Sequence, residues 1–196
     1  MTRKNVAAVL ITAVLAVGLT ACSSDASTTA APTSVPTTTA DASPFGAEAN
    51  SDLIAKIHRD NATAIVETVE ARSGTPDHAL AALLAAEAET GWRSGLSMAP
   101  PATGIRDIYG WRFGYNIAAD STDAVKAATN TFMDNAATVT VSADDPAAYA
   151  LAVQHADPRG YNEKEHFYKK GETAATEYAA ALPKAQAAYA ELRGSE

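Results

Sequence analysis

The sequence predicts an all-α domain that follows an export signal and a low-complexity linker. Apolar residues recur at helical spacing in several stretches after residue 50, and helix-capping residues stand before these stretches. The β-branched run at 138–141 is too short to predict a strand. Of the 196 residues, the roughly 147 that follow residue 49 suffice for one domain with its own hydrophobic core.

The first predicted helix covers about 51–72 and ends in a connection that also begins the next helix. Gly74 suits a helix end, Thr75 suits an N-cap and Pro76 suits a first helical position. The apolar stripe of this helix consists of Ile54, Ile57, Ala62, Ile65 and Val69.

The second predicted helix, 76–90, consists almost entirely of Ala and Leu. A helix that is apolar on all sides is usually central and packed on several faces. The acids Glu87 and Glu89 in its last turns are therefore at an energetically unfavourable place.

The segment 91–119 has no helical period and contains several Gly, Pro and aromatic residues. Nearly thirty residues without regular structure form a long loop, and loops of this length are often functional. The segment holds four aromatic residues that we consider below: Trp92, Tyr109, Trp111 and Tyr115.

Three more helices are expected in the C-terminal half. Ser121 caps one, and Asp145-Pro146 opens another that carries Tyr149. A break at 157–160 precedes a final helix, which Pro183 is expected to kink or split.

The N-terminus predicts export. A basic start is followed by the apolar run Val6–Leu19, which would span about 21 Å as a helix and is too short for a hydrocarbon core of about 30 Å. It ends in Leu19-Thr20-Ala21-Cys22, which resembles a bacterial lipobox. We therefore expect residues 1–21 to be a lipoprotein signal peptide and Cys22 to be lipidated, which places the protein on the outer face of the cell membrane. The alternative is a plain secretory signal with an incidental cysteine.

Residues 22–49 are expected to be a linker. Nineteen of the 22 residues in Ser23–Pro44 are Ser, Thr, Ala or Pro, a composition that cannot bury enough apolar surface to fold. A random coil of this length reaches about 25–30 Å. The linker would lift the domain at 50–196 away from the bilayer.

Composition and charge exclude several classes of protein. The single cysteine rules out an internal disulfide framework. The net charge of −8 becomes about −10 once the two basic residues of the signal are removed, which argues against nucleic acid as a partner. We expect no bound cofactor.

Glu89 is the residue with the clearest chemical potential. A carboxyl group near the end of an apolar helix is poorly hydrated, and desolvation disfavours its charged form. Cleavage of a glycosidic bond needs a carboxylic acid that can protonate the leaving oxygen. The alternative is that Glu87 and Glu89 are solvated residues on an exposed edge.

The segment Glu89-Thr90-Gly91-Trp92-Arg93, at the end of an Ala-rich helix, resembles the catalytic Glu motif of the lysozyme-like superfamily. It is most similar to the lytic transglycosylase and bacterial glucosaminidase branches. The segments 145–154 and 157–161 resemble the C-terminal half of these domains, in which a helix bearing Tyr or Gln closes the glycan groove. The resemblance implies a lysozyme-like fold, an activity on peptidoglycan glycan strands, and Glu89 rather than Glu87 as the general acid.

The sequence also departs from these families. Transglycosylases carry a Gly-Leu-Met-Gln-like segment after the catalytic helix, and glucosaminidases carry an Asn-Leu-Phe-Gly-like one. The stretch Tyr109–Asn116 keeps glycines and aromatics but matches neither. A second catalytic residue is therefore not assigned. A non-catalytic lipoprotein whose domain binds glycan or an envelope protein stays open as the alternative function.

Five aromatic residues are candidates for stacking on sugar rings: Trp92, Tyr109, Trp111, Tyr115 and Tyr149. They could equally be the packing that holds the long loop in place. A metal site near Glu163, His166, His155 and Asp157 is a weaker alternative, because the di-iron helices that use such a spacing need two copies of the motif.

Overall fold

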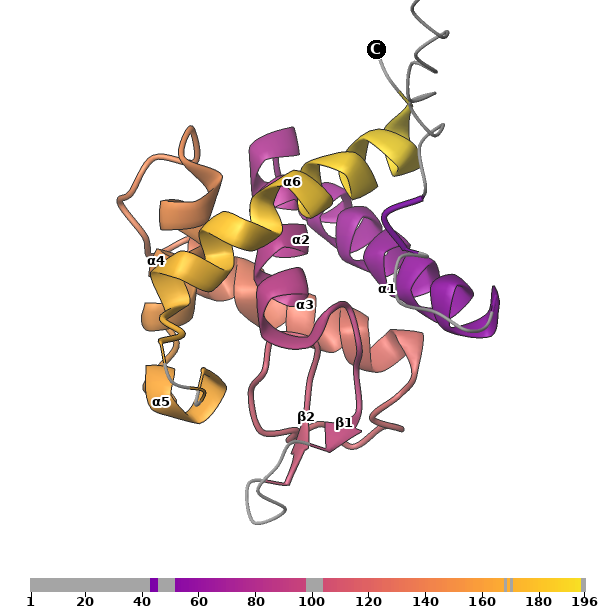
Figure 1. Ribbon diagram of the computed structural model, residues 1–196, viewed down its shortest axis with the longest axis horizontal. Helices are drawn as coiled ribbons and strands as arrows, with labels where there is room; N and C mark the ends of the chain where they lie inside the picture. Colours follow the sequence, from indigo (N-terminus) through magenta and orange to yellow (C-terminus); the bar gives the residue numbers. More distant parts are fainter. Residues whose placement is uncertain (1–42, 46–51, 98–103, 168, 170, 195–196) are drawn as a thin grey trace, which may run out of the picture. The chain divides into compact units, whose positions relative to one another are not determined.

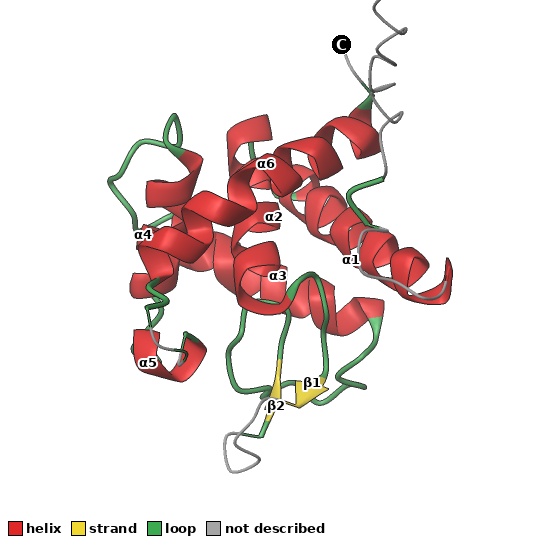
Figure 2. Ribbon diagram, viewed as in Figure 1, coloured by secondary structure: helices red, strands yellow, loops and turns green. Residues whose placement is uncertain are grey.

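The computed structural model describes residues 43–45, 52–97, 104–167, 169 and 171–194. The predicted signal peptide, Cys22 and most of the predicted linker lie outside these ranges. The described part is mostly helical, which confirms the all-α prediction (Figure 2). No helix within the described ranges is long and apolar enough to cross a membrane.

The elements follow one another in an order that Figure 1 shows by colour. The helices are α1 (Asp52–Ala71), α2 (Pro76–Thr90), α3 (Thr122–Ala136), α4 (Pro146–His155), α5 (Glu163–His166) and α6 (Ala174–Arg193). The strands are β1 (Leu96–Ser97) and β2 (Ile105–Arg106), which pair antiparallel.

Helix α2 is the centre of the helical packing. It contacts α1, α4 and α6, and Figure 1 shows α6 crossing over it. Because nearly every side chain in its middle is Ala or Leu, the residues at 81–86 are all fully buried. The sequence-based prediction of a central helix at 76–90 is confirmed.

Capping side chains begin three of the helices at the predicted positions. Thr75, Ser121 and Asp145 each accept a hydrogen bond from the backbone N–H three residues ahead, which satisfies a donor that the helix itself leaves free. Helix α6 runs through Pro183 as a single element, so the helix is not split there.

The apolar stripe of α1 is only partly buried. Ala62, Ile65 and Val69 lie in the core, whereas Ile54 and Ile57 are 44% and 43% exposed. Only the C-terminal part of α1 therefore faces the other helices.

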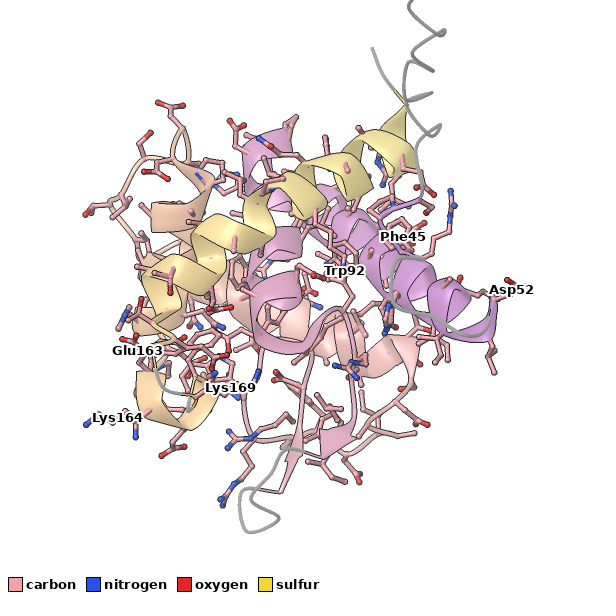
Figure 3. The ribbon with its side chains drawn as sticks, in the orientation of Figure 1. Phe45, Asp52, Trp92, Glu163, Lys164 and Lys169 are labelled. Carbon is pink, nitrogen blue, oxygen red and sulfur yellow. The ribbon has the colours of Figure 1, made fainter. Side chains whose placement is uncertain are left out.

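The described parts of 91–119, which are 91–97 and 104–119, are mostly loop, as predicted, but they contain two short strands, which were not predicted. At the start of this segment Trp92 has a left-handed backbone (φ +60°) and is fully buried. Its indole donates to Leu83 O at 3.0 Å, and its ring lies 5.0 Å from that of Phe45 (Figure 3). Phe45, which falls within the predicted linker at 22–49, is thus part of the described core.

Candidate functional site

Glu89 stands in the last turn of α2, where the chain leaves the helix. Gly91 adopts a left-handed conformation (φ 61°, ψ 41°) and its N–H caps the last carbonyls of the helix. This ending turns the chain away directly after Glu89. The side chain of Glu89 is only 1% exposed, so its carboxyl group must find partners inside the protein.

Donors surround the carboxyl group of Glu89. The hydroxyls of Tyr161 and Tyr178 each donate to Oε1 at 2.8 Å, and Gln154 Nε2 lies 3.5 Å from the same oxygen. The other oxygen, Oε2, lies 2.5 Å from Nδ1 of His166. The carboxyl group therefore joins α2 to the segments that contain α4, α5 and α6.

The two phenols act as donors and keep their protons. Burial, reinforced by the negative charge of Glu89, raises the pKa of Tyr161 and of Tyr178 above the ordinary value. Because both hydroxyls point at Oε1, that oxygen has its lone pairs occupied. A proton on the carboxyl group must then be on Oε2.

One proton lies between Glu89 and His166. At 2.5 Å, Nδ1 and Oε2 are too close for two facing lone pairs, so either the imidazole donates to a carboxylate or a carboxylic acid donates to the imidazole. In both cases the two side chains share one proton, and both are almost fully buried.

A tight turn at 107–110 brings the long loop against this pair. Asp107 Oδ1 accepts hydrogen bonds from the N–H groups of Tyr109 and Trp111 at 2.9 and 3.1 Å. Gly110 has a left-handed backbone, and a Cβ placed on it would lie 2.8 Å from both Glu89 Oε2 and His166 Nδ1. Glycine is therefore the residue that lets the loop pass this close.

Charged side chains next to the turn at 107–110 hold it in position. Burial raises the pKa of Asp107 to about 7, and the nearby Arg159 opposes this shift. Burial also acts on Asp157, but the bidentate hydrogen bonds from Arg159 outweigh it and lower its pKa. Arg159 is thus held by Asp157 and lies 3.9 Å from Asp107.

Gln154 connects the site to the loop. Its amide oxygen accepts from Trp111 Nε1 at 2.6 Å, and its amide nitrogen donates to Tyr109 O at 2.9 Å. The side chain is 1% exposed, so this amide is a buried junction between α4, the loop and Glu89.

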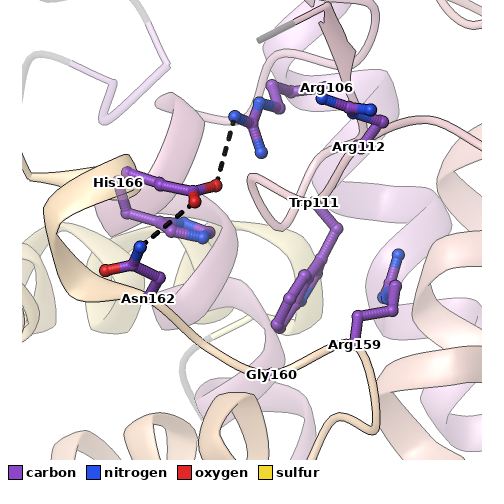
Figure 4. Close-up of a pocket in the computed structure, with 8 residues that line it drawn as sticks. Arg106, Trp111, Arg112, Arg159, Gly160, Asn162 and His166 are labelled. Carbon is purple, nitrogen blue, oxygen red and sulfur yellow. Dashed lines mark hydrogen bonds and ion pairs between the residues drawn. The ribbon is translucent and has the colours of Figure 1, made fainter.

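Two cavities adjoin the site, and His166 lines both. One, of about 180 Å³, is lined by Glu89, Phe167 and Glu177 among others. The other, of about 300 Å³, is lined by Trp111, Asn162 and three arginines (Figure 4). The Glu89–His166 pair therefore stands between two spaces that a ligand could occupy.

Glu87 has a different role from Glu89. Its Oε1 accepts from Lys184 Nζ at 2.7 Å, which forms an ion pair between α2 and α6. Lys184 also lies over the ring of Trp92, 4.9 Å from its centroid. The alternative that both acids are solvated residues on an exposed edge does not hold, because Glu89 is buried.

Of the five predicted sugar-stacking residues, Trp111 lines one of the two cavities described above, and the other four line neither of them. Trp92 is 0% and Tyr109 is 1% exposed, so neither ring can stack on a sugar in this conformation. Tyr109 instead stacks on Phe132, with centroids 4.9 Å apart. Both rings belong to the packing of the loop on the helices.

The remaining two predicted residues lie apart from the cavity walls described above. Tyr115 is half-buried and its hydroxyl contacts Thr131 at 3.2 Å. Tyr149 is buried and packs edge-on against His78. Neither is placed next to Glu89 by a contact in the described part of the structure.

Sequence reasoning did not assign His166, Tyr178 or Gly110 to this site. Two weak signals were present: Gly110 lies in the glycine- and aromatic-containing stretch Tyr109–Asn116, and His166 stands three residues after Glu163. Tyr178 lies in the predicted final helix, and nothing in its own surroundings singles it out. Its distance of 89 residues from Glu89 left no local pattern to detect.

Within the described ranges, no group of three His, Cys, Asp or Glu side chains is placed to hold a metal ion. Glu163 accepts from the backbone N–H of Ala174 at 2.7 Å, and His166 is engaged by Glu89. Of the four residues in the weaker metal hypothesis, Glu163 and His166 therefore have other partners, and Asp157 is held by Arg159.

Comparisons with known proteins add no assignment. No family model, no curated protein and no solved structure matches this chain.

Proposed function

We propose that the protein is a membrane-anchored enzyme that cleaves peptidoglycan glycan strands, with Glu89 as the proton donor. The observation that carries the proposal is the 2.5 Å contact between Glu89 Oε2 and His166 Nδ1, with a cavity on either side of the histidine. Buried acid–base pairs next to cavities are typical of catalytic sites.

The chemistry needs one proton at one oxygen. The proton on Oε2 passes to the glycosidic oxygen as the bond from that oxygen to the anomeric carbon breaks, and the bonding electrons go to the leaving oxygen. The hydrogen bonds from Tyr161 and Tyr178 stabilise the carboxylate that is left. The hydroxyl at C6 of the same sugar then bonds to the anomeric carbon and gives its proton to the Glu89 carboxylate, which yields a 1,6-anhydro product; if water attacks instead, it gives its proton to the same carboxylate and yields a reducing end.

The sequence resemblance supports the same assignment. A buried, Ala-rich central helix that ends in Glu-Thr-Gly-Trp is the arrangement expected from the lysozyme-like superfamily. We propose on these grounds that the helical fold is lysozyme-like.

Catalysis requires the site to open. With its side chain 1% exposed, Glu89 cannot reach a glycosidic oxygen until His166 moves away from Oε2. His166 ends the four-residue helix α5, which is the shortest helix in the described part of the chain. We infer that displacement of this segment joins the two cavities and exposes the acid.

The same burial favours a second candidate function. A carboxylate that accepts from two phenols and a histidine can serve as a structural junction, and the loop covers it through Gly110. The protein would then be a non-catalytic envelope lipoprotein whose domain binds glycan or a protein partner.

The deciding experiment is muropeptide mass spectrometry on purified peptidoglycan. The protein should begin at Ser23, since Phe45 belongs to the core. Glu89→Gln is the test variant and Glu87→Gln, on the same helix turn, is the matched control. Products from the wild type and Glu87→Gln alone support the enzyme, and the absence of products from a folded wild type supports the binding function.

Localisation is tested separately through Cys22. We propose that its lipid holds the protein on the outer face of the membrane. Membrane fractionation of the full chain and of Cys22→Ser should show the wild type in the membrane fraction and the variant released.

A further inference from the structure

The larger of the two cavities has an unusual charge for this protein. It is lined by Arg106, Arg112 and Arg159, although the whole chain has a net charge of −8 (Figure 4). We call the space enclosed by these arginines, Trp111, Asn162 and Glu165 the arginine pocket. Its volume of about 300 Å³ fits a single sugar ring or a group of similar size.

Arg106 is buried and incompletely paired. Its side chain is 6% exposed, and one guanidinium nitrogen donates to Gly110 O at 3.1 Å. Its Nε has no hydrogen-bond partner among the described residues. Burying a guanidinium is costly unless its charge is compensated, and the carboxylate nearest to Arg106, that of Glu165, lies 4.0 Å away, so the positive charge at this wall is only partly compensated.

Glu165 shows which kind of anion the pocket accepts. Its carboxylate takes a hydrogen bond from Asn162 Nδ2 at 3.1 Å and lies 4.0 Å from Arg106 (Figure 4). Its side chain is 55% exposed, so the carboxylate reaches in from the mouth. A carboxylate brought by a ligand could take the same donors and displace it.

The remaining wall of the pocket supplies two further cations, Arg159 and Arg112. The guanidinium of Arg159 lies over the ring of Trp111, 4.4 Å from its centroid, and is held there by Asp157. Arg112 is exposed, and no acid within the described ranges forms an ion pair with it. Its charge is therefore available to a ligand.

We propose that the arginine pocket binds a carboxylate carried by the glycan strand, either the lactyl carboxylate of N-acetylmuramic acid or a carboxylate of its stem peptide. This inference rests on the proposed function, because it names which part of peptidoglycan the site recognises. Guanidinium groups suit carboxylates through paired hydrogen bonds. Since His166 lines this pocket and also touches Glu89, a sugar held here lies beside the acid.

The test is a set of binding titrations by calorimetry with the chain from Ser23 to Glu196. The probes are N-acetylmuramic acid, N-acetylglucosamine, which lacks the lactyl group, and N-acetylmuramoyl-L-alanyl-D-isoglutamine, in which the lactyl carboxyl is an amide and the peptide supplies a carboxylate. Binding of either carboxylate probe, at least tenfold tighter than N-acetylglucosamine, supports the proposal and identifies the source. Equal binding of all three, or no binding, overturns it.

Two variants that should change the affinity for the probes in opposite directions make the test specific. Arg112→Gln should weaken binding about tenfold, because one charge-assisted hydrogen bond is lost. Glu165→Gln should tighten binding about threefold, because the competing carboxylate is removed. Arg193→Gln, which breaks a distant pair with Glu70, is the control and should change nothing. An unchanged affinity in Arg112→Gln, or weaker binding in Glu165→Gln, contradicts the proposal.

These readouts are independent of cleavage, because none of the probes contains a bond between two sugars. Failure of the carboxylate site would leave a wild type that still cleaves peptidoglycan. Failure of the enzyme proposal would appear instead as uncleaved peptidoglycan with probe binding intact.

Discussion

His166 Nδ1 lies 2.5 Å from Oε2 of Glu89, although the two residues are 77 positions apart in the chain. The contact places a basic nitrogen from the short helix α5 on the acid at the end of α2. Both side chains are almost fully buried, at 3% and 1% exposure. Any change that separates these two atoms should therefore affect the stability of the domain as well as its chemistry.

Gly110→Ala should separate Glu89 Oε2 from His166 Nδ1. The new Cβ would lie 2.8 Å from each of the two atoms, so the loop or the pair must shift. We expect a loss of about 2–4 kcal/mol in the free energy of unfolding, from overpacking added to the cost of a left-handed alanine. Gly104→Ala is the matched control, because Gly104 has a similar φ of +77° and no neighbour within 4 Å. Urea denaturation that gives equal losses for the two variants would contradict this account.

Tyr178→Phe tests how much the hydrogen bond from the Tyr178 hydroxyl to Glu89 Oε1 contributes to stability. The variant keeps the ring but removes a buried hydroxyl that donates at 2.8 Å, which should cost about 1–3 kcal/mol of stability. Tyr149→Phe is the control, since the hydroxyl of Tyr149 bonds to none of the described residues and its loss should cost less than about 0.5 kcal/mol. Thermal denaturation of both variants is the measurement, and similar melting temperatures would refute the prediction.

Asp107 should make the stability depend on pH. Its pKa rises from 3.8 to about 7 on folding because of burial. The folded state therefore holds a proton that the unfolded state has lost, and stability falls as pH rises from about 4 to 7, by at most about 1.4 kcal/mol per pH unit. Asp107→Asn removes this contribution. The difference between the unfolding free energies of wild type and variant should thus change between pH 4.5 and 7.5. If the two unfolding free energies vary with pH in parallel, Asp107 does not make this contribution.

Trp92→Phe should act on stability alone. The indole of Trp92 is fully buried and donates to Leu83 O, so its replacement should cost about 2 kcal/mol through a lost hydrogen bond and a small cavity. Trp111→Phe should instead weaken binding of the carboxylate probes. Calorimetry should show unchanged probe binding in Trp92→Phe, whose ring is in the core, and weaker binding in Trp111→Phe, whose ring lines the cavity. A loss of binding in a folded Trp92→Phe protein would show that Trp92 has been wrongly assigned to the core alone.

The sequence predicted those parts of the fold that depend on local chemistry. The bounds of α2 follow from Thr75, Pro76 and Gly91, each of which acts on its own neighbours. The four residues of α5 are too few for a periodic pattern, and the strands of two residues each are too short for an alternating one. These elements depend on tertiary contacts and could not be predicted.

The candidate site was predictable only at its centre. Glu89 stood out because an acid in an apolar helix is costly, which is a local observation. Its partners Gln154, Tyr161 and Tyr178 lie 65, 72 and 89 residues away and are ordinary polar or aromatic residues in their own surroundings. The aromatic residues of the loop were predicted as a group, but burial divides them, since Trp92 and Tyr109 pack inside and Trp111 reaches a cavity.

The sequence separation of Tyr178 from Glu89 also determines at which stage of folding the site can form. During synthesis the chain emerges from its N-terminus, so the segment that ends in Glu89 is available long before α6 arrives. Until then a carboxyl group at the end of an apolar helix lacks its buried donors and stays in water, and α2 cannot be enclosed. We expect assembly of the site to coincide with the last and slowest step of folding, as contacts between distant parts of a chain usually do. A chain interrupted before α6 would accordingly carry the acid without the surroundings that give it a function.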